Sequence, residues 1–297
     1  MKKIILTGLI IVFVQSIFGQ NYHNEFKKYC KTKDTLSQRQ LLRKWEEEKP
    51  NEAELYTSYF NYYFSQSFRE VVSISPNPDK DGNFQITDSL NNIKGYINSS
   101  TRIIEDYQKK GLEYIDEGIK EYPTRLDMRF GKIYSLGQYK DWNNFTNEIL
   151  KTIDYSNVIN NQWTWTYNES VEDSKNFFLS GIQDYVLQLY ETGDDDLLKN
   201  MREISQKVLE YYPNHVESLS NISITYLLTR EYDKGIEVLL KAEKINPKDY
   251  IVLSNIAHAY KLQGDKEMSI DYYEKTMKYG DDQAKEFARK QIEELGN

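Results

Sequence analysis

The sequence of 297 residues is poor in four residue types: it has one cysteine, three histidines, six prolines and 14 glycines. Because Cys30 is alone, no disulfide can form within the chain, and packing must supply the stability. So few prolines and glycines leave few of the turns that a β-rich fold of this length needs, which favours helices. The histidines are not spaced as metal ligands, and we expect no metal and no cofactor.

The same scarcity argues against an enzyme. His23 and Cys30 could share a helix face as base and nucleophile, but they lie near the N-terminus, where order is least assured. The acidic run 194–196 follows Gly193 and is typical of a helix start. The sequence contains neither a glycine-rich phosphate loop nor a hydrolase elbow. We therefore predict no catalytic activity.

Charge and the first residues indicate the compartment. The net charge is −8 and no basic cluster is present, so we expect no nucleic-acid partner. Lys2 and Lys3 precede an apolar stretch, residues 4–14, that is too short to span a bilayer, and a small residue, Gly19, follows. We interpret residues 1–19 as a secretory signal peptide rather than a retained anchor. The expected product is exported, periplasmic or secreted, without a stable membrane anchor, and its net charge changes from −8 to −10 because both lysines leave.

A repeat is the main positive signal. Leu219-Ser220-Asn221-Ile222 recurs 34 residues later as Leu253-Ser254-Asn255-Ile256, and Pro213 and Pro247 have the same separation. The 25 tyrosines fit a thin architecture, because a tyrosine ring can pack while its hydroxyl stays in water.

This pattern resembles the tetratricopeptide repeat, a helix–turn–helix unit of 34 residues. Residues 216–249 and 250–283 fit it clearly, and 281–295 has the apolar spacing of a capping helix. Residues 35–213 fit as degenerate repeats, which gives about five repeats within 20–297. The resemblance implies an all-α, right-handed helical-hairpin solenoid.

Two stretches do not fit the repeat. Pro50 and Pro123 are 73 residues apart, an excess of about 39 over one repeat, and 70–88 contains β-prone runs around an Asp-Gly turn. We expect a β-hairpin or ordered loop there. A calcium loop is an alternative, with ligands at positions 1, 3, 5 and 12 from Asn77, Asp79, Asp81 and Asp88 and a glycine, Gly82, at position 6. The second stretch, 154–175, contains Trp163 and Trp165, which either pin the insertion or line a ligand site.

The resemblance also implies a binding surface. In tetratricopeptide proteins the first helix of each repeat lines a concave groove that receives a peptide or a protein partner. By register these positions are Ser220, Asn221, Ile224, Leu228, Ser254, Asn255, His258 and Lys261. The amides of Asn221 and Asn255 could hold a peptide backbone, although in this family an asparagine here is also partly structural. We predict a scaffold of the cell envelope that binds protein or peptide. The alternative is a glycan-binding module that uses Trp163 and Trp165.

Overall fold

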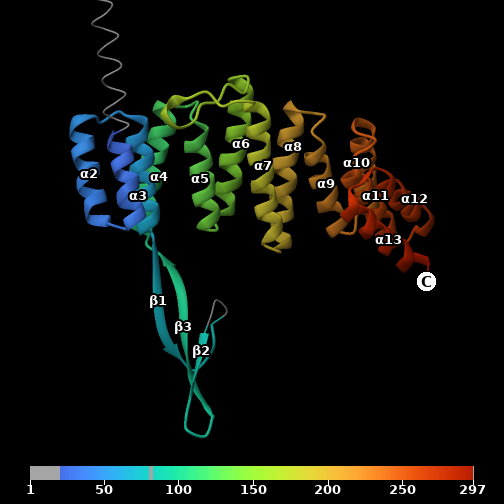
Figure 1. Cartoon of the computed structure of the whole chain (residues 1–297), viewed down its shortest axis with the longest axis horizontal. Helices are drawn as coiled ribbons and strands as arrows, with labels where there is room; N and C mark the ends of the chain where they lie inside the picture. Colours follow the sequence, from blue (N-terminus) through green and yellow to red (C-terminus); the bar gives the residue numbers. More distant parts are fainter. Residues whose placement is uncertain (1–20, 80–82, 297) are drawn as a thin grey trace, which may run out of the picture. The chain divides into compact units, whose positions relative to one another are not determined.

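The computed structural model describes residues 21–79 and 83–296, which form two compact units (Figure 1). Unit 1 extends to Lys140 and includes the later segment Trp163–Val171, and unit 2 comprises Asp141–Gln162 and the chain from Glu172 on. The predicted signal peptide, 1–19, lies outside the described residues. Among the helices described, none is both long and apolar enough to cross a bilayer.

Unit 1 is built from helical hairpins. Residues 21–32 are helical, and the helices that follow are α2 (Thr35–Glu48), α3 (Ala53–Gln66), α4 (Glu105–Glu121) and α5 (Leu126–Gln138). Trp45 and Tyr59 are buried in the core between α2 and α3. The hairpin of α3 and α4 depends on Gly118, because a Cβ there would lie 2.9 Å from the Cβ of Tyr56.

A three-stranded antiparallel sheet interrupts this hairpin. Its strands are β1 (Phe68–Ser75), β2 (Asn83–Thr87) and β3 (Ile93–Ile103), in the order β1-β3-β2. Figure 1 shows the sheet extending away from the ends of α3 and α4. We call residues 68–103 the β arm. It is longer than the hairpin expected over 70–88, because a third strand returns along β1 as far as Ile103.

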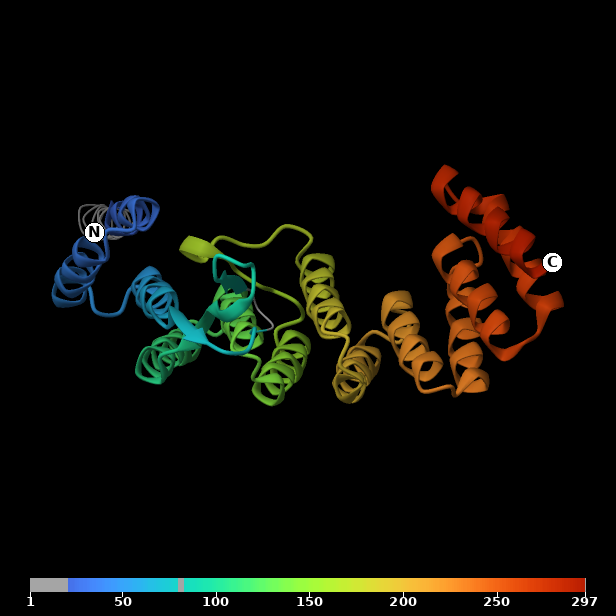
Figure 2. The same ribbon diagram turned by 90° about the horizontal axis from the view of Figure 1, so that it is seen from below.

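Unit 2 is a series of helices in which neighbours along the chain pack together. They are α6 (Trp142–Val158), α7 (Ser174–Glu191), α8 (Leu198–Tyr211), α9 (Val216–Leu228), α10 (Tyr232–Ile245), α11 (Tyr250–Gln263), α12 (Lys266–Tyr279) and α13 (Asp282–Gly296). In Figure 2, which looks along many of these helices, each lies beside the next. The predicted class, an all-α helical-hairpin solenoid of the tetratricopeptide type with a small β insertion, is confirmed.

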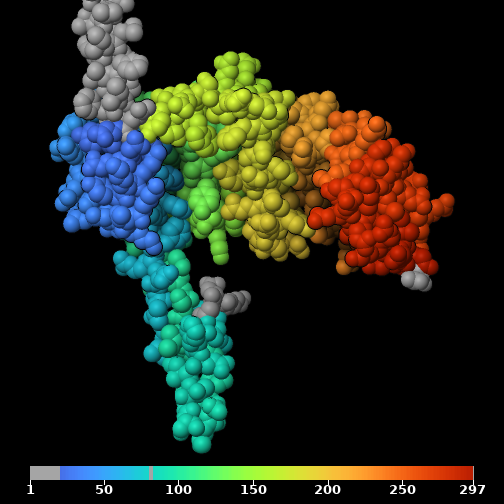
Figure 3. Space-filling model, viewed as in Figure 1, coloured from blue at the N-terminus to red at the C-terminus, as the bar shows by residue number. Residues whose placement is uncertain are grey.

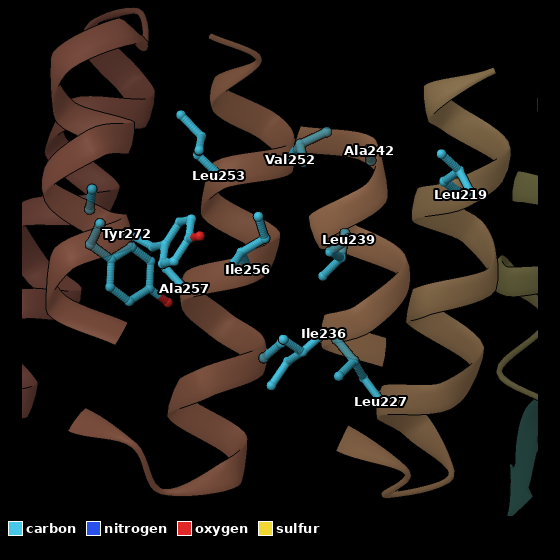
Figure 4. Packing of buried hydrophobic residues seen from close by; sticks show 13 residues of the cluster. Leu219, Leu227, Ile236, Leu239, Ala242, Val252, Leu253, Ile256, Ala257 and Tyr272 are labelled. Carbon is cyan, nitrogen blue, oxygen red and sulfur yellow. The ribbon is translucent and has the colours of Figure 1, made fainter. Parts of the chain in front are cut away.

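The core of unit 2 explains the 34-residue period. Leu239 and Ile256 are fully buried between α10 and α11, and burial of each such side chain contributes about 1.5–3 kcal/mol (Figure 4). Gly235 lets α10 approach α9, since a Cβ at this position would lie 2.7 Å from Cδ2 of Leu227. Gly264, with a φ of 92°, ends α11 in the left-handed conformation that glycine adopts without strain.

Candidate binding site

The candidate residues lie on one face of α9 and of α11. Asn221, Ile224 and Leu228 are spaced at i, i+3 and i+7, so they share the face of α9 opposite its buried Leu219 and Ile222. Asn255, His258 and Leu262 repeat this arrangement on α11. Helix α9 packs between α7 and α11, so all three helices contribute to the same wall of unit 2.

Asn221 is held inside the protein and does not project as a free amide. Its Nδ2 donates to Oε1 of Gln183 on α7 at 2.7 Å, and Nε2 of Gln183 donates back to its Oδ1 at 3.2 Å. The Asn221 side chain is accordingly buried, with 6% of its surface exposed. The reciprocal bond uses both halves of the amide, so Asn221 joins α9 to α7 in this structure and is not free to grip a peptide backbone.

The counterparts on α11 are more accessible. Ser254 and Asn255 are half-buried, like Ser220 on α9, and His258 is exposed. Partial desolvation and the nearby charge of Lys261 lower the pKa of His258, so the imidazole is neutral at pH 7. Lys261 donates to Oε1 of Gln291 and Oε2 of Glu294 on α13, each at 2.8 Å. Its charge is therefore neutralised by the capping helix and is not directed at a ligand.

Exposed apolar side chains continue this wall. On α9 and α11 they are Leu228 and Leu262, exposed to 48% and 41%. Leu187 and Tyr190 on α7 are exposed to 48% and 47%, and they follow Gln183 at i+4 and i+7 on the same helix face. We call these four residues the apolar row. Sequence reasoning did not find its α7 half, because α7 lies outside the two clear repeats.

The two tryptophans of the second insertion belong to unit 1. Trp163 is buried, with 1% of its surface exposed, and the guanidinium of Arg129 lies 5.7 Å from its ring centroid. Trp165 is half-buried and meets Phe130 edge to face. The expected pair of exposed rings is therefore not formed, because the Trp163 ring packs into the protein.

A buried ionic network holds this segment in place. Nη1 of Arg125 donates to Oε1 of Glu54 at 2.9 Å, and its Nε and Nη2 donate to the carboxylate of Asp127 at 2.8 Å each. The backbone N–H of Tyr167 donates to the same Glu54 oxygen at 2.7 Å. The sequence gave no signal for this network, because its partners are up to 113 residues apart.

His23 and the other polar candidates serve structural roles in the described part of the chain. Nδ1 of His23 and the hydroxyl of Tyr167 lie 3.0 Å apart, and burial lowers the pKa of His23 to about 4. Nδ1 of His215 accepts from the backbone N–H of Ser218 and caps α9. Asp88 accepts the N–H groups of Leu90 and Asn92 and so closes the β2–β3 turn.

Metal ligands do not converge in the residues described. Within 21–79 and 83–296, no group of three His, Cys, Asp or Glu side chains is placed to hold an ion. Two residues of the calcium alternative, Asp81 and Gly82, lie outside that range. The alternative therefore stays a hypothesis.

Comparison with known proteins identifies the repeat. Residues 216–249 and 251–278 match the family model described as the tetratricopeptide repeat. The chain is therefore a protein that contains tetratricopeptide repeats. Among curated proteins, no sequence matches it significantly.

Several solved structures have a similar arrangement of helices. One is the C-terminal part of a TPR repeat-containing protein from Cytophaga hutchinsonii, at 11% identity and a TM-score of 0.44, covering 86% of this chain and 78% of that one. Another is YrrB, described as a TPR protein with an unusual peptide-binding site, at 12% identity and 0.41, covering 84% and 97%. A third is MamA from Desulfovibrio magneticus RS-1, at 12% and 0.38, covering 59% and 86%.

Proposed function

We propose that this protein is an exported, non-catalytic scaffold of the cell envelope that binds a peptide or protein partner through the wall formed by α7, α9 and α11. The observation that carries the proposal is the apolar row, Leu187, Tyr190, Leu228 and Leu262, in which each side chain is 41–48% exposed. Contiguous exposed apolar side chains on a folded protein mark surfaces that a partner covers.

The chemistry of the wall fits an extended peptide or an amphipathic helix. The apolar row offers contacts for aliphatic or aromatic side chains, and Ser220, Ser254 and Asn255 beside it offer hydrogen bonds to a backbone. Lys261 is already paired with Glu294. The wall therefore lacks the cluster of free cations that would select a terminal carboxylate, and we expect recognition to depend on apolar side chains.

Selection from a displayed random-peptide library tests the binding surface. The double variant Leu228→Asp/Leu262→Asp places two charges in the apolar row, and both positions are exposed enough for the fold to accept them. We expect peptides with apolar anchors that bind the wild type at least about tenfold more tightly than this variant, since loss of one buried aliphatic contact alone approaches this factor. The matched control is Ile245→Asp on α10, an exposed aliphatic position of the same unit, at 39%. Equal binding by the wild type and the double variant would contradict the proposed surface.

Export is a separate part of the proposal and has its own test. The motive is the sequence of residues 1–19, with two lysines, an apolar stretch and a small residue at its end. Fusion of these residues to an alkaline phosphatase that is active only outside the cytoplasm should give activity, and the purified protein should begin at Gln20. An inactive fusion with an intact N-terminus would rule out the signal peptide.

The glycan-binding alternative would require an exposed pair of rings at Trp163 and Trp165. Trp163 is 1% exposed, so this platform has no structural support.

A further inference from the structure

The β arm has one apolar face and one polar face. In an antiparallel sheet, residues directly opposite each other point to the same side. Ile97 of β3 lies opposite Ile74 of β1 and opposite Phe84 of β2, so these three side chains form a row across the whole sheet. Val72, opposite Ser99, and Ile103, opposite Phe68, extend this apolar face along the arm.

The opposite face is hydrophilic, and part of it is covered by the chain itself. It carries Arg69, Ser73, Gln85, Asn98, Ser100 and Arg102. Asn98 is buried because the segment after β1 folds over it: its Nδ2 donates to Oγ of Ser75 and to the carbonyl of Asn77, and its Oδ1 accepts from the N–H of Asp79. The loop therefore protects the polar side, although the apolar side is the one whose burial would be favourable.

The apolar face stays open to solvent. Ile74 and Phe84 are exposed to 75% and 76%, Val72 to 67%, and Ile97 and Ile103 to 38% each. In Figure 3 the atoms of the arm stand clear of the helices of unit 1. An amphipathic sheet ordinarily packs its apolar face against a second layer, and here none of the described residues supplies one.

We infer that the missing layer is the apolar face of a second copy, so that two β arms pack face to face as a small β-sandwich across a twofold axis. An isologous contact of this kind needs one self-complementary patch, and an apolar row that runs across all three strands meets this condition.

Two observations favour a second copy as the occupant. Side chains of 150–250 Å² with these exposures present roughly 600 Å² per arm, so a pair would bury roughly 1,200 Å², the lower bound for a specific interface. The arm also carries four acidic and four basic residues between 68 and 103, so two arms can approach without net repulsion, although the whole chain is acidic.

The oligomeric state in solution tests this inference, and sedimentation equilibrium of the purified protein across about 1–100 µM gives it directly. We expect a monomer–dimer equilibrium within this range, as for an interface near the lower size limit. The double variant Ile74→Asp/Phe84→Asp should weaken association at least about tenfold, because it buries charges in the contact. The matched control Ser73→Asp/Gln85→Asp alters neighbouring positions of the same two strands on the polar face and should associate like the wild type.

Thermal unfolding of both double variants shows that they remain folded, which is expected because Ile74 and Phe84 are three-quarters exposed. Wild-type protein that stays monomeric at 100 µM overturns the inference, and so does a dimer that Ile74→Asp/Phe84→Asp leaves intact. Flotation of a monomeric wild type with anionic or zwitterionic vesicles, abolished by this variant, would assign the apolar face to a lipid surface and likewise overturn it. None of these readouts depends on the wall of unit 2.

Discussion

Removal of the Arg125 guanidinium should destabilise unit 1 more than any exposed charge in the protein. Arg125 makes three charge-assisted hydrogen bonds of 2.8–2.9 Å to the carboxylates of Glu54 and Asp127. Its side chain is 1% exposed, and those of the two acids are 11% and 14% exposed. Burial alone would lower the pKa of Arg125, but the bonds and charges of Asp127 and Glu54 outweigh burial and raise it.

The expected cost follows from what the substitution leaves behind. Arg125→Ala keeps two carboxylates in a site that water barely reaches and removes the cation between them, for which we expect a loss of about 3–5 kcal/mol in the free energy of unfolding. Arg125→Lys keeps the charge but cannot form the two parallel bonds to Asp127, so we expect about half that loss.

Urea unfolding followed by tryptophan fluorescence measures the effect, because Trp45 and Trp163 of unit 1 are both buried. Lys241→Ala is the control, since it breaks an exposed pair with Glu237 and should cost less than about 0.5 kcal/mol. A loss below about 1 kcal/mol for Arg125→Ala would refute the reasoning, because the two acids would then be stable without their cation.

Three further substitutions test other parts of the structure. Gly118→Ala should cost about 1–3 kcal/mol in unfolding free energy, because the new methyl would lie 2.9 Å from the Cβ of Tyr56; an unchanged urea midpoint would contradict this packing. Asn221→Ala should cost about 1–2 kcal/mol, measured the same way, because it leaves the Gln183 amide without its partner; a neutral effect would mean that water replaces it. Burial lowers the pKa of His23 to about 4 from 6.5, so as pH falls from 6.5 to 4 the unfolded state takes up the proton first and stability declines. His23→Asn should reduce that decline by about 2 kcal/mol, and identical pH profiles of unfolding would exclude a buried, neutral His23.

The repeat could be predicted in detail because each of its positions has the same packing task in every copy. Small residues such as Gly235 and Ala257 lie where helices approach, and Leu239 and Tyr273 fill equivalent core positions 34 residues apart. Periodicity therefore located α9 to α12 and the capping helix α13. The prolines also indicated the size of the first insertion, since the β arm has 36 residues from Phe68 to Ile103 and about 39 were expected.

The third strand was harder to predict. The sequence of β3 is Ile-Lys-Gly-Tyr-Ile-Asn-Ser-Ser-Thr-Arg-Ile, in which polar residues dominate and Gly95 is unfavourable in a strand. Its strand character comes from pairing with β1 on one side and β2 on the other. Such pairing is a non-local interaction, and local propensity does not reveal it.

The binding wall was predicted on two of its three helices. Spacing placed Asn221 and Asn255 on the correct faces, but the partner of Asn221 is Gln183, 38 residues earlier and outside the 34-residue register. The burial of Trp163 was equally inaccessible to sequence reasoning, because it depends on how the loop that contains it folds over Arg129.

The order in which the chain visits its two units has a consequence for biosynthesis. The polypeptide leaves unit 1 at Lys140, builds one helix of unit 2, and returns to unit 1 for Trp163–Val171. Glu54 receives the N–H of Tyr167 only from this returning segment. A nascent chain that has emerged only to Lys140 therefore holds an unfinished N-terminal half, so the protein must reach more than half its length before that half can close.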